Sequence, residues 1–76
     1  MSATKTIIMD EKRPSLEEAQ KVVGGYVELL DVSGGQLLVN EEGLLRSLPV
    51  NPTASEIAGQ PILGNALLLK GSAKWD

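Results

Sequence analysis

The sequence contains neither cysteine nor histidine, and this absence limits how a chain of 76 residues can be stabilised. A domain of this size buries only about 60% of its unfolded surface, so small domains often add disulfides or a structural metal. Here leucine, isoleucine and valine must form the core, because there is one tyrosine, one tryptophan and no phenylalanine. We expect a single domain over residues 1–76, with an ordered core at about 4–70 and a polar, frayed tail at 71–76.

The clearest local signal is a helix at residues 15–23. Ser15 and Glu18 have the spacing of a capping box, in which each side chain bonds the other residue's backbone N–H. Gly24 suits the left-handed residue that commonly ends a helix. Apolar residues between them follow at helical spacing and predict one buried stripe: Leu16, Ala19, Val22 and Val23.

Three strands are predicted around this helix. Residues 4–9 are a short β-prone run that ends in charged residues and a proline. Residues 26–32 and 36–40 flank Ser33-Gly34-Gly35, where glycine accepts the positive φ of a tight turn. This arrangement predicts a β-hairpin after the helix.

The second half of the chain contains further turn signals. The segment 40–43 is a turn from which 44–48 is expected to return as a third antiparallel strand. A second, weaker capping-box spacing predicts a short helix at 53–58 that ends at Gly59. The apolar run 62–70 is expected to form the last strand.

These elements predict an α+β fold of order β-α-β-β-β-(short α)-β. The sheet is expected to be small, curled and mainly antiparallel, with four to five strands packed on one helix plus a short second helix. Its strands would carry apolar side chains on both faces, whereas a half-exposed strand alternates apolar and polar residues. The second face must then be covered by curvature and the short helix, or by another copy or partner. The residues concerned are Leu29/Leu30, Leu37/Leu38, Leu44/Leu45 and Leu67/Leu68/Leu69.

Charge and hydropathy exclude two classes of partner. The net charge is −3, from seven basic and ten acidic residues. Nucleic-acid-binding proteins usually gather Lys and Arg on one face with stacking aromatics, and neither feature is present. No stretch approaches the ~20 apolar residues that span a bilayer, and the first residues lack the apolar run of a signal peptide. We therefore expect a cytoplasmic protein that binds neither nucleic acid nor membranes.

Few residues are suited to catalysis or to metal binding. Without histidine and cysteine, a nucleophile lacks its usual base. The glutamate pairs at 17–18 and 41–42 are expected to lie in water, the first at a favourable helix N-terminus. Asn40 with 41–42 offers fewer oxygen ligands than a calcium loop needs. Gly24-Gly25 follows a helix instead of opening one, so it predicts no phosphate site. We expect no enzymatic activity, no cofactor and no metal.

Four segments in fixed order carry a family resemblance: VGGYVE at 23–28, NEEG at 40–43, LPVN at 48–51 and ILGNALL at 62–68. They resemble a family of short domains of unknown function found largely in bacteriophages and mobile elements. The resemblance implies a small phage accessory protein that acts in an infected bacterial cell. It brings no established catalytic residues. Its recurring polar positions fall on Asn40, Glu41, Glu42 and Asn51.

A binding site is predicted where Asn40, Glu42, Arg46 and Asn51 would gather at one end of the sheet, with Glu41 beside them. The alternative is that the two asparagines cap neighbouring backbone. The leading functional hypothesis is a protein that engages and modulates a bacterial host protein, by inhibition or in host takeover and anti-defence. One alternative is an oligomeric sponge for a nucleotide-like signal, which needs a polar pocket holding Arg46. The other is a phage structural or assembly component.

Overall fold

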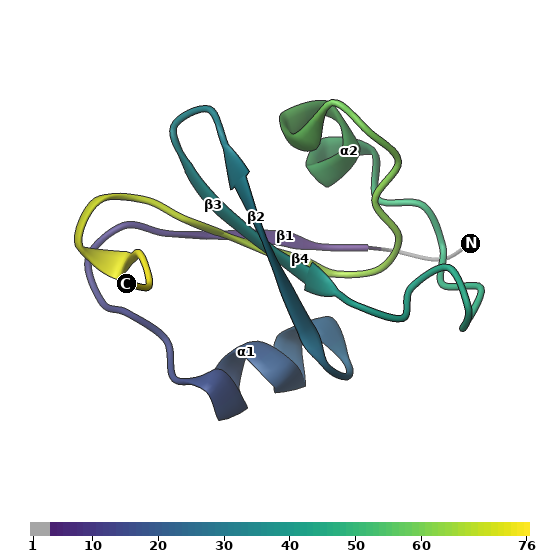
Figure 1. Ribbon diagram of the computed structural model, residues 1–76, viewed down its shortest axis with the longest axis horizontal. Helices are drawn as coiled ribbons and strands as arrows, with labels where there is room; N and C mark the ends of the chain where they lie inside the picture. Colours follow the sequence, from purple (N-terminus) through teal and green to yellow (C-terminus); the bar gives the residue numbers. More distant parts are fainter. Residues whose placement is uncertain (1–3) are drawn as a thin grey trace.

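A four-stranded mixed sheet is the centre of the fold (Figure 1). The computed structural model describes residues 4–76. The strands lie in the order β1-β4-β3-β2, with β1 parallel to β4 and the other neighbours antiparallel. The predicted α+β class is confirmed. In chain order the elements are β1 (Thr6–Met9), α1 (Leu16–Val23), β2 (Val27–Val32), β3 (Gly35–Asn40), α2 (Pro52–Ala58), β4 (Ala66–Leu69) and the 3₁₀ turn η1 (Gly71–Ala73).

The two helices lie on opposite sides of this sheet (Figure 1), so each face has its own core. Successive strand residues point to opposite faces, which divides the leucines of β3 and β4 between the two cores. The α1 side buries Ala19, Leu38, Leu67, Leu69 and Ala73. The α2 side buries Leu37, Val39, Ala54, Ile62, Ala66 and Leu68. Helix packing on both faces therefore accounts for the leucine pairs of the two central strands. Among residues 4–76, none of the helices has the length and apolar character that crossing a membrane requires.

Helix α1 begins and ends as the sequence predicts. The Ser15 hydroxyl accepts from the Glu18 N–H at 3.1 Å, and the Glu18 carboxylate accepts from the Ser15 N–H at 2.8 Å. Gly24 takes the left-handed conformation, with φ 82°. The hydrogen bond from the Ser15 backbone lowers the pKa of Glu18 below its ordinary value of 4.5. Because the pKa of Glu18 is lower in the folded state than in the unfolded state, the stabilisation is fully present at a pH above the ordinary pKa. It is lost as the pH falls through the pKa of the folded state.

Replacing Ser15 with alanine is expected to destabilise the domain by about 1 kcal/mol, since the Glu18 N–H loses its partner in the first turn. Urea denaturation followed by circular dichroism measures the change. Ser33→Ala is the matched control, because Ser33 is exposed in the β2–β3 turn. Equal midpoints for the two variants would contradict a stabilising role for the cap.

The strand predicted at 44–48 is wrong. Residues 41–47 instead form consecutive turns, in which the Arg46 N–H donates to the Glu42 carbonyl at 2.9 Å and Ser47 adopts φ 51°. Both edges of β3 are already paired, one with β2 and the other with β4. A strand at 44–48 would need one of those edges. The third antiparallel strand is therefore β4, which comes from the end of the chain.

Two further boundaries differ from prediction. Helix α2 begins one residue earlier, with Asn51 as its N-cap and Pro52 in the first turn, where a missing N–H costs nothing. The run 62–70 contains only the short strand β4, since Gly64 at φ 88° interrupts it and Leu63 forms an isolated bridge with Val50. The predicted end of α2 at Gly59 is confirmed.

The C-terminal tail is ordered against the sheet and is not frayed as predicted. Ala73 is fully buried in the α1-side core, and Trp75 packs against that core. The Gln36 side-chain amide exchanges two 2.6 Å hydrogen bonds with the backbone of Trp75. The indole N–H donates to the Pro14 carbonyl at 3.0 Å. These bonds join the tail to β3 and to the start of α1.

Candidate functional site

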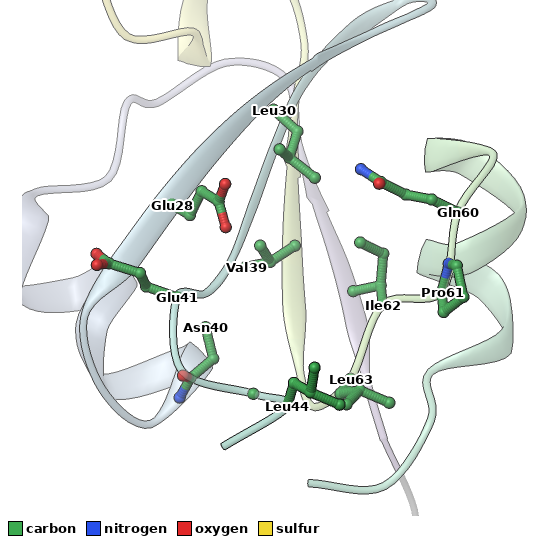
Figure 2. Close-up of a pocket in the computed structure, with 11 residues that line it drawn as sticks. Glu28, Leu30, Val39, Asn40, Glu41, Leu44, Gln60, Pro61, Ile62 and Leu63 are labelled. Carbon is green, nitrogen blue, oxygen red and sulfur yellow. The ribbon is translucent and has the colours of Figure 1, made fainter. Parts of the chain in front are cut away.

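A groove with a volume of about 430 Å³ lies on the α2 side of the sheet. Residues from β2 and β3 form one wall, and the segment that follows α2 forms the other (Figure 2). Val39 and Ile62 are almost fully buried at its floor, and Leu30 lies beside them. We call this hollow the α2-side groove. Its lining consists of Glu28, Leu30, Val39, Asn40, Glu41, Gly43, Leu44, Gln60, Pro61, Ile62 and Leu63.

The rim of the groove is acidic on one side. Figure 2 shows the Glu28 carboxylate on the β2–β3 wall and the Glu41 carboxylate at the outer edge of that wall, directed away from the hollow, with Gln60 and Pro61 on the opposite wall. No lysine or arginine is among the lining residues. At the end of the groove Leu44 is 83% exposed, which leaves an apolar side chain in water beside the opening. The groove thus combines an apolar floor, an exposed leucine and negative charge.

A separate polar cluster joins the 41–47 turns to the end of α1. The Asn40 amide donates to the Val23 carbonyl at 3.0 Å, while its oxygen accepts from the Glu42 N–H at 2.7 Å. Arg46 donates to the Gly24 carbonyl at 2.6 Å. Its positive charge is favourable there, because the C-terminal end of a helix carries partial negative charge. The side chains of Glu42 and Arg46 line a shallow hollow of about 340 Å³ beside Tyr26.

Any side chain at position 25 would crowd this cluster. A Cβ atom at that position would lie 3.0 Å from both the Arg46 guanidinium and the Asn40 amide. Both side chains would have to shift by a few tenths of an ångström. The second glycine of the VGGY segment therefore allows these two side chains to reach the helix end.

Asn51 lies apart from this cluster, beneath α2, and is 1% exposed. Its oxygen accepts from the Ala54 N–H and the Thr6 hydroxyl, both at 3.1 Å. Its amide donates to the carbonyls of Gly64 at 3.0 Å and Lys5 at 3.2 Å. Every hydrogen-bonding atom of this side chain is thus engaged by the protein's own backbone or by a neighbouring hydroxyl.

The predicted site residues therefore divide among three places. Asn40, Glu42 and Arg46 come together at the end of α1, Glu41 stands on the rim of the α2-side groove, and Asn51 lies under α2. Both asparagines cap backbone groups, which is the alternative that the sequence left open. Sequence reasoning did not single out Glu28, Val39 or Ile62, because these groove residues come from three separate segments. The one available signal was Glu28, one of two acidic residues in an otherwise apolar strand.

No metal centre is evident in the part of the chain that the structure describes. Residues 4–76 contain no group of three or more aspartate, glutamate, cysteine or histidine side chains placed to hold an ion. The buried polar side chains in this range all have hydrogen-bond partners. What the arrangement offers chemically is therefore an apolar surface with acceptor oxygens at its edge.

The fold and the groove define a small α+β protein with a mixed four-stranded sheet and an open groove that has acidic residues at its rim. The chain belongs to the family described as a domain of unknown function, DUF3846, whose model matches residues 2–75. No curated protein and no solved structure shows a significant match to the chain. Membership confirms the coarser part of the resemblance, an uncharacterised family. The bacteriophage origin stays a prediction.

Proposed function

We propose that this protein acts by binding another protein through the α2-side groove. The observation that carries the proposal is the combination of an apolar floor at Val39 and Ile62 with the carboxylates of Glu28 and Glu41 on the rim. Its volume of about 430 Å³ lies in the range of small binding pockets. The matching partner segment inserts an apolar side chain and places a lysine or arginine beside the carboxylates.

The charge distribution favours this function over sequestration of a nucleotide-like signal. A phosphate would be repelled by Glu28 and Glu41, and no basic side chain lines the groove to offset them. Arg46 and Asn40 are engaged by carbonyl groups at the end of α1. That end of a helix carries partial negative charge, which disfavours an anion.

The family resemblance supports a biological setting for this binding. We place the protein in the cytoplasm of an infected bacterial cell, as a phage accessory protein. There it engages a host protein and inhibits or redirects it, with anti-defence as one such role. In this proposal the protein acts without catalysis, so its effect depends on occupying a surface of its target.

Binding is expected to depend on Leu44 and to be indifferent to Leu45. The tagged protein is used to purify partners from bacterial lysate, and proteins and small molecules are identified by mass spectrometry. We expect one dominant protein whose recovery falls about tenfold with Leu44→Ser, the effect of removing an interface anchor. Leu45→Ser is the matched control, because Leu45 is 85% exposed and lies outside the groove lining.

Charge reversal tests the role of the acidic rim separately from that of the apolar residues. Glu28→Lys combined with Glu41→Lys should abolish recovery, whereas Glu11→Lys with Glu56→Lys makes the same change of charge away from the groove. A co-purifying nucleotide without a protein would overturn the proposal in favour of the sponge. Equal recovery with all variants would show that the groove is not the binding surface. A partner found only among virion components would replace the host-directed role with assembly.

A further inference from the structure

Strand β1 forms one edge of the sheet and has an unpaired side. The carbonyls of Lys5 and Met9 accept hydrogen bonds from Ala66 and Lys70, so the odd-numbered residues of this segment face β4. In a parallel pair, successive residues of a strand direct their backbone groups alternately towards the neighbouring strand and away from it. The N–H and C=O groups of Thr6 and Ile8 therefore point away from the sheet. Within residues 4–76, no group forms a hydrogen bond with these outward atoms.

The side chains of this edge are apolar and exposed. Ile8 is 59% exposed on the α2 side, and Ile7 is 41% exposed on the α1 side. Helix α1 makes its main contacts with β2, β3 and β4. Beside β1 lies an apolar slot of about 220 Å³, lined by Ile7, Met9, Pro14, Glu18, Val22 and Leu67.

The opposite edge of the sheet, formed by β2, is protected from pairing by charged residues. Strand β2 contains two acidic residues, Glu28 and Asp31, and no basic residue. In-strand charges are a common device that prevents edge strands from pairing with other chains. Strand β1, with the sequence TIIM, has no charged residue. Of the two edge strands, only β1 combines free backbone groups with a sequence that has no charged residue.

The charges that flank β1 indicate what pairs with it. Lys5 immediately precedes the strand and Asp10 immediately follows it. If a second copy paired in antiparallel orientation, the end of β1 that carries Lys5 in each chain would lie beside the end that carries Asp10 in the other. Parallel pairing would place like charges side by side, which is unfavourable. The edge is therefore complementary to itself under a two-fold axis.

We propose that two copies of this chain associate through β1 in antiparallel orientation, with Ile7 on the two-fold axis. Thr6 of each copy then exchanges both backbone hydrogen bonds with Ile8 of the other, which satisfies all the outward groups. The two Ile7 side chains meet directly across the axis, at the mouths of the two apolar slots. The sheets of the two copies become one continuous sheet.

This dimer presents two α2-side grooves, because each groove lies over β2 and β3, at the edge farthest from β1. A target with two copies of the recognised segment would gain avidity from simultaneous binding. The inference does not rest on the proposed function, since β1 contributes nothing to the groove lining.

The test is sedimentation equilibrium on the purified full chain, over about 10 μM to about 1 mM, because a single short edge buries less than the roughly 800 Å² per partner of a stable interface. The mass is expected to rise from 8.1 kDa towards twice that value. Ile7→Lys and Ile7→Glu should each weaken association at least tenfold, since like charges would meet across the axis. An equimolar mixture of the two variants should associate again, because a lysine of one chain then meets a glutamate of the other.

Ile8→Lys serves as a second disrupting variant, and Leu45→Lys as the control that should dimerise like the wild-type chain. Circular dichroism spectra confirm that each variant is folded before its mass is measured. A wild-type mass of 8.1 kDa at every concentration would overturn the proposal. Association that persists in Ile7→Lys and Ile7→Glu, or a mixture that stays monomeric, would also overturn it. A strand from another protein bound at β1, with no self-association, would assign this edge to a different occupant.

Discussion

Replacing Asn51 with alanine is expected to cost about 3 kcal/mol or more, a large part of the stability of a domain this small. The change removes the N-cap of α2, worth about 1 kcal/mol. It also leaves the buried carbonyl of Gly64 without its donor, at about 1–3 kcal/mol. The thermal midpoint should fall by about 15 °C, which differential scanning calorimetry would measure.

Asn65→Ala is the matched control for this prediction. The Asn65 oxygen accepts one exposed hydrogen bond, from the Lys5 N–H at 2.8 Å, and its loss should cost well under half as much. A second control, Thr6→Val, removes only the hydroxyl bond to Asn51. If Asn51→Ala were no more destabilising than Asn65→Ala, the large contribution to stability assigned to the Asn51 side chain would be wrong.

Asn51 also shows where sequence reasoning reaches its limit. Asn51 lies before the second predicted helix, and backbone capping was one of the two interpretations of this residue. Its bonds to Lys5 and Thr6 join the first strand to α2 across some 45 residues of chain. No spacing rule connects residues so far apart in sequence, so this link between the two ends of the fold was found only in the structure.

Three features that depend on neighbouring residues were predicted correctly. The capping box of α1 needs only Ser15 and Glu18, and its end needs only the left-handed preference of Gly24. The β2–β3 hairpin likewise follows from its turn, in which Gly34 has φ 88°. In each case the partners are separated by a few residues, and local geometry leaves few alternatives.

Features that depend on competition between distant segments were not predicted. Residues 44–48 have a strand-like composition, but β4 occupies the edge of β3 that they would need. The parallel pairing of β1 with β4 joins the two ends of the chain and has no local signature. The candidate groove has the same origin, since its floor joins β3 to a segment after α2. Only the grouping of Asn40, Glu42 and Arg46 was accessible, because they lie within one turn region.

The C-terminal tail provides the second large effect. Replacing Trp75 with alanine is expected to destabilise the domain by about 3 kcal/mol, because the indole packs on the α1-side core and its N–H satisfies the Pro14 carbonyl. Trp75→Phe keeps an aromatic ring and loses the hydrogen bond, so about 1 kcal/mol is expected.

Urea denaturation of the tail variants is best followed by circular dichroism, since Trp75 is the chain's one tryptophan. Ser72→Ala, at an exposed position of the same turn, should leave the midpoint unchanged. In the unsubstituted protein, tryptophan fluorescence and circular dichroism should report the same midpoint, because the tail is held to β3 by Gln36 and unfolds with the sheet. Fluorescence that changes at lower urea than the circular dichroism, together with a stable Trp75→Ala variant, would mean that the tail detaches independently and contributes little to the fold.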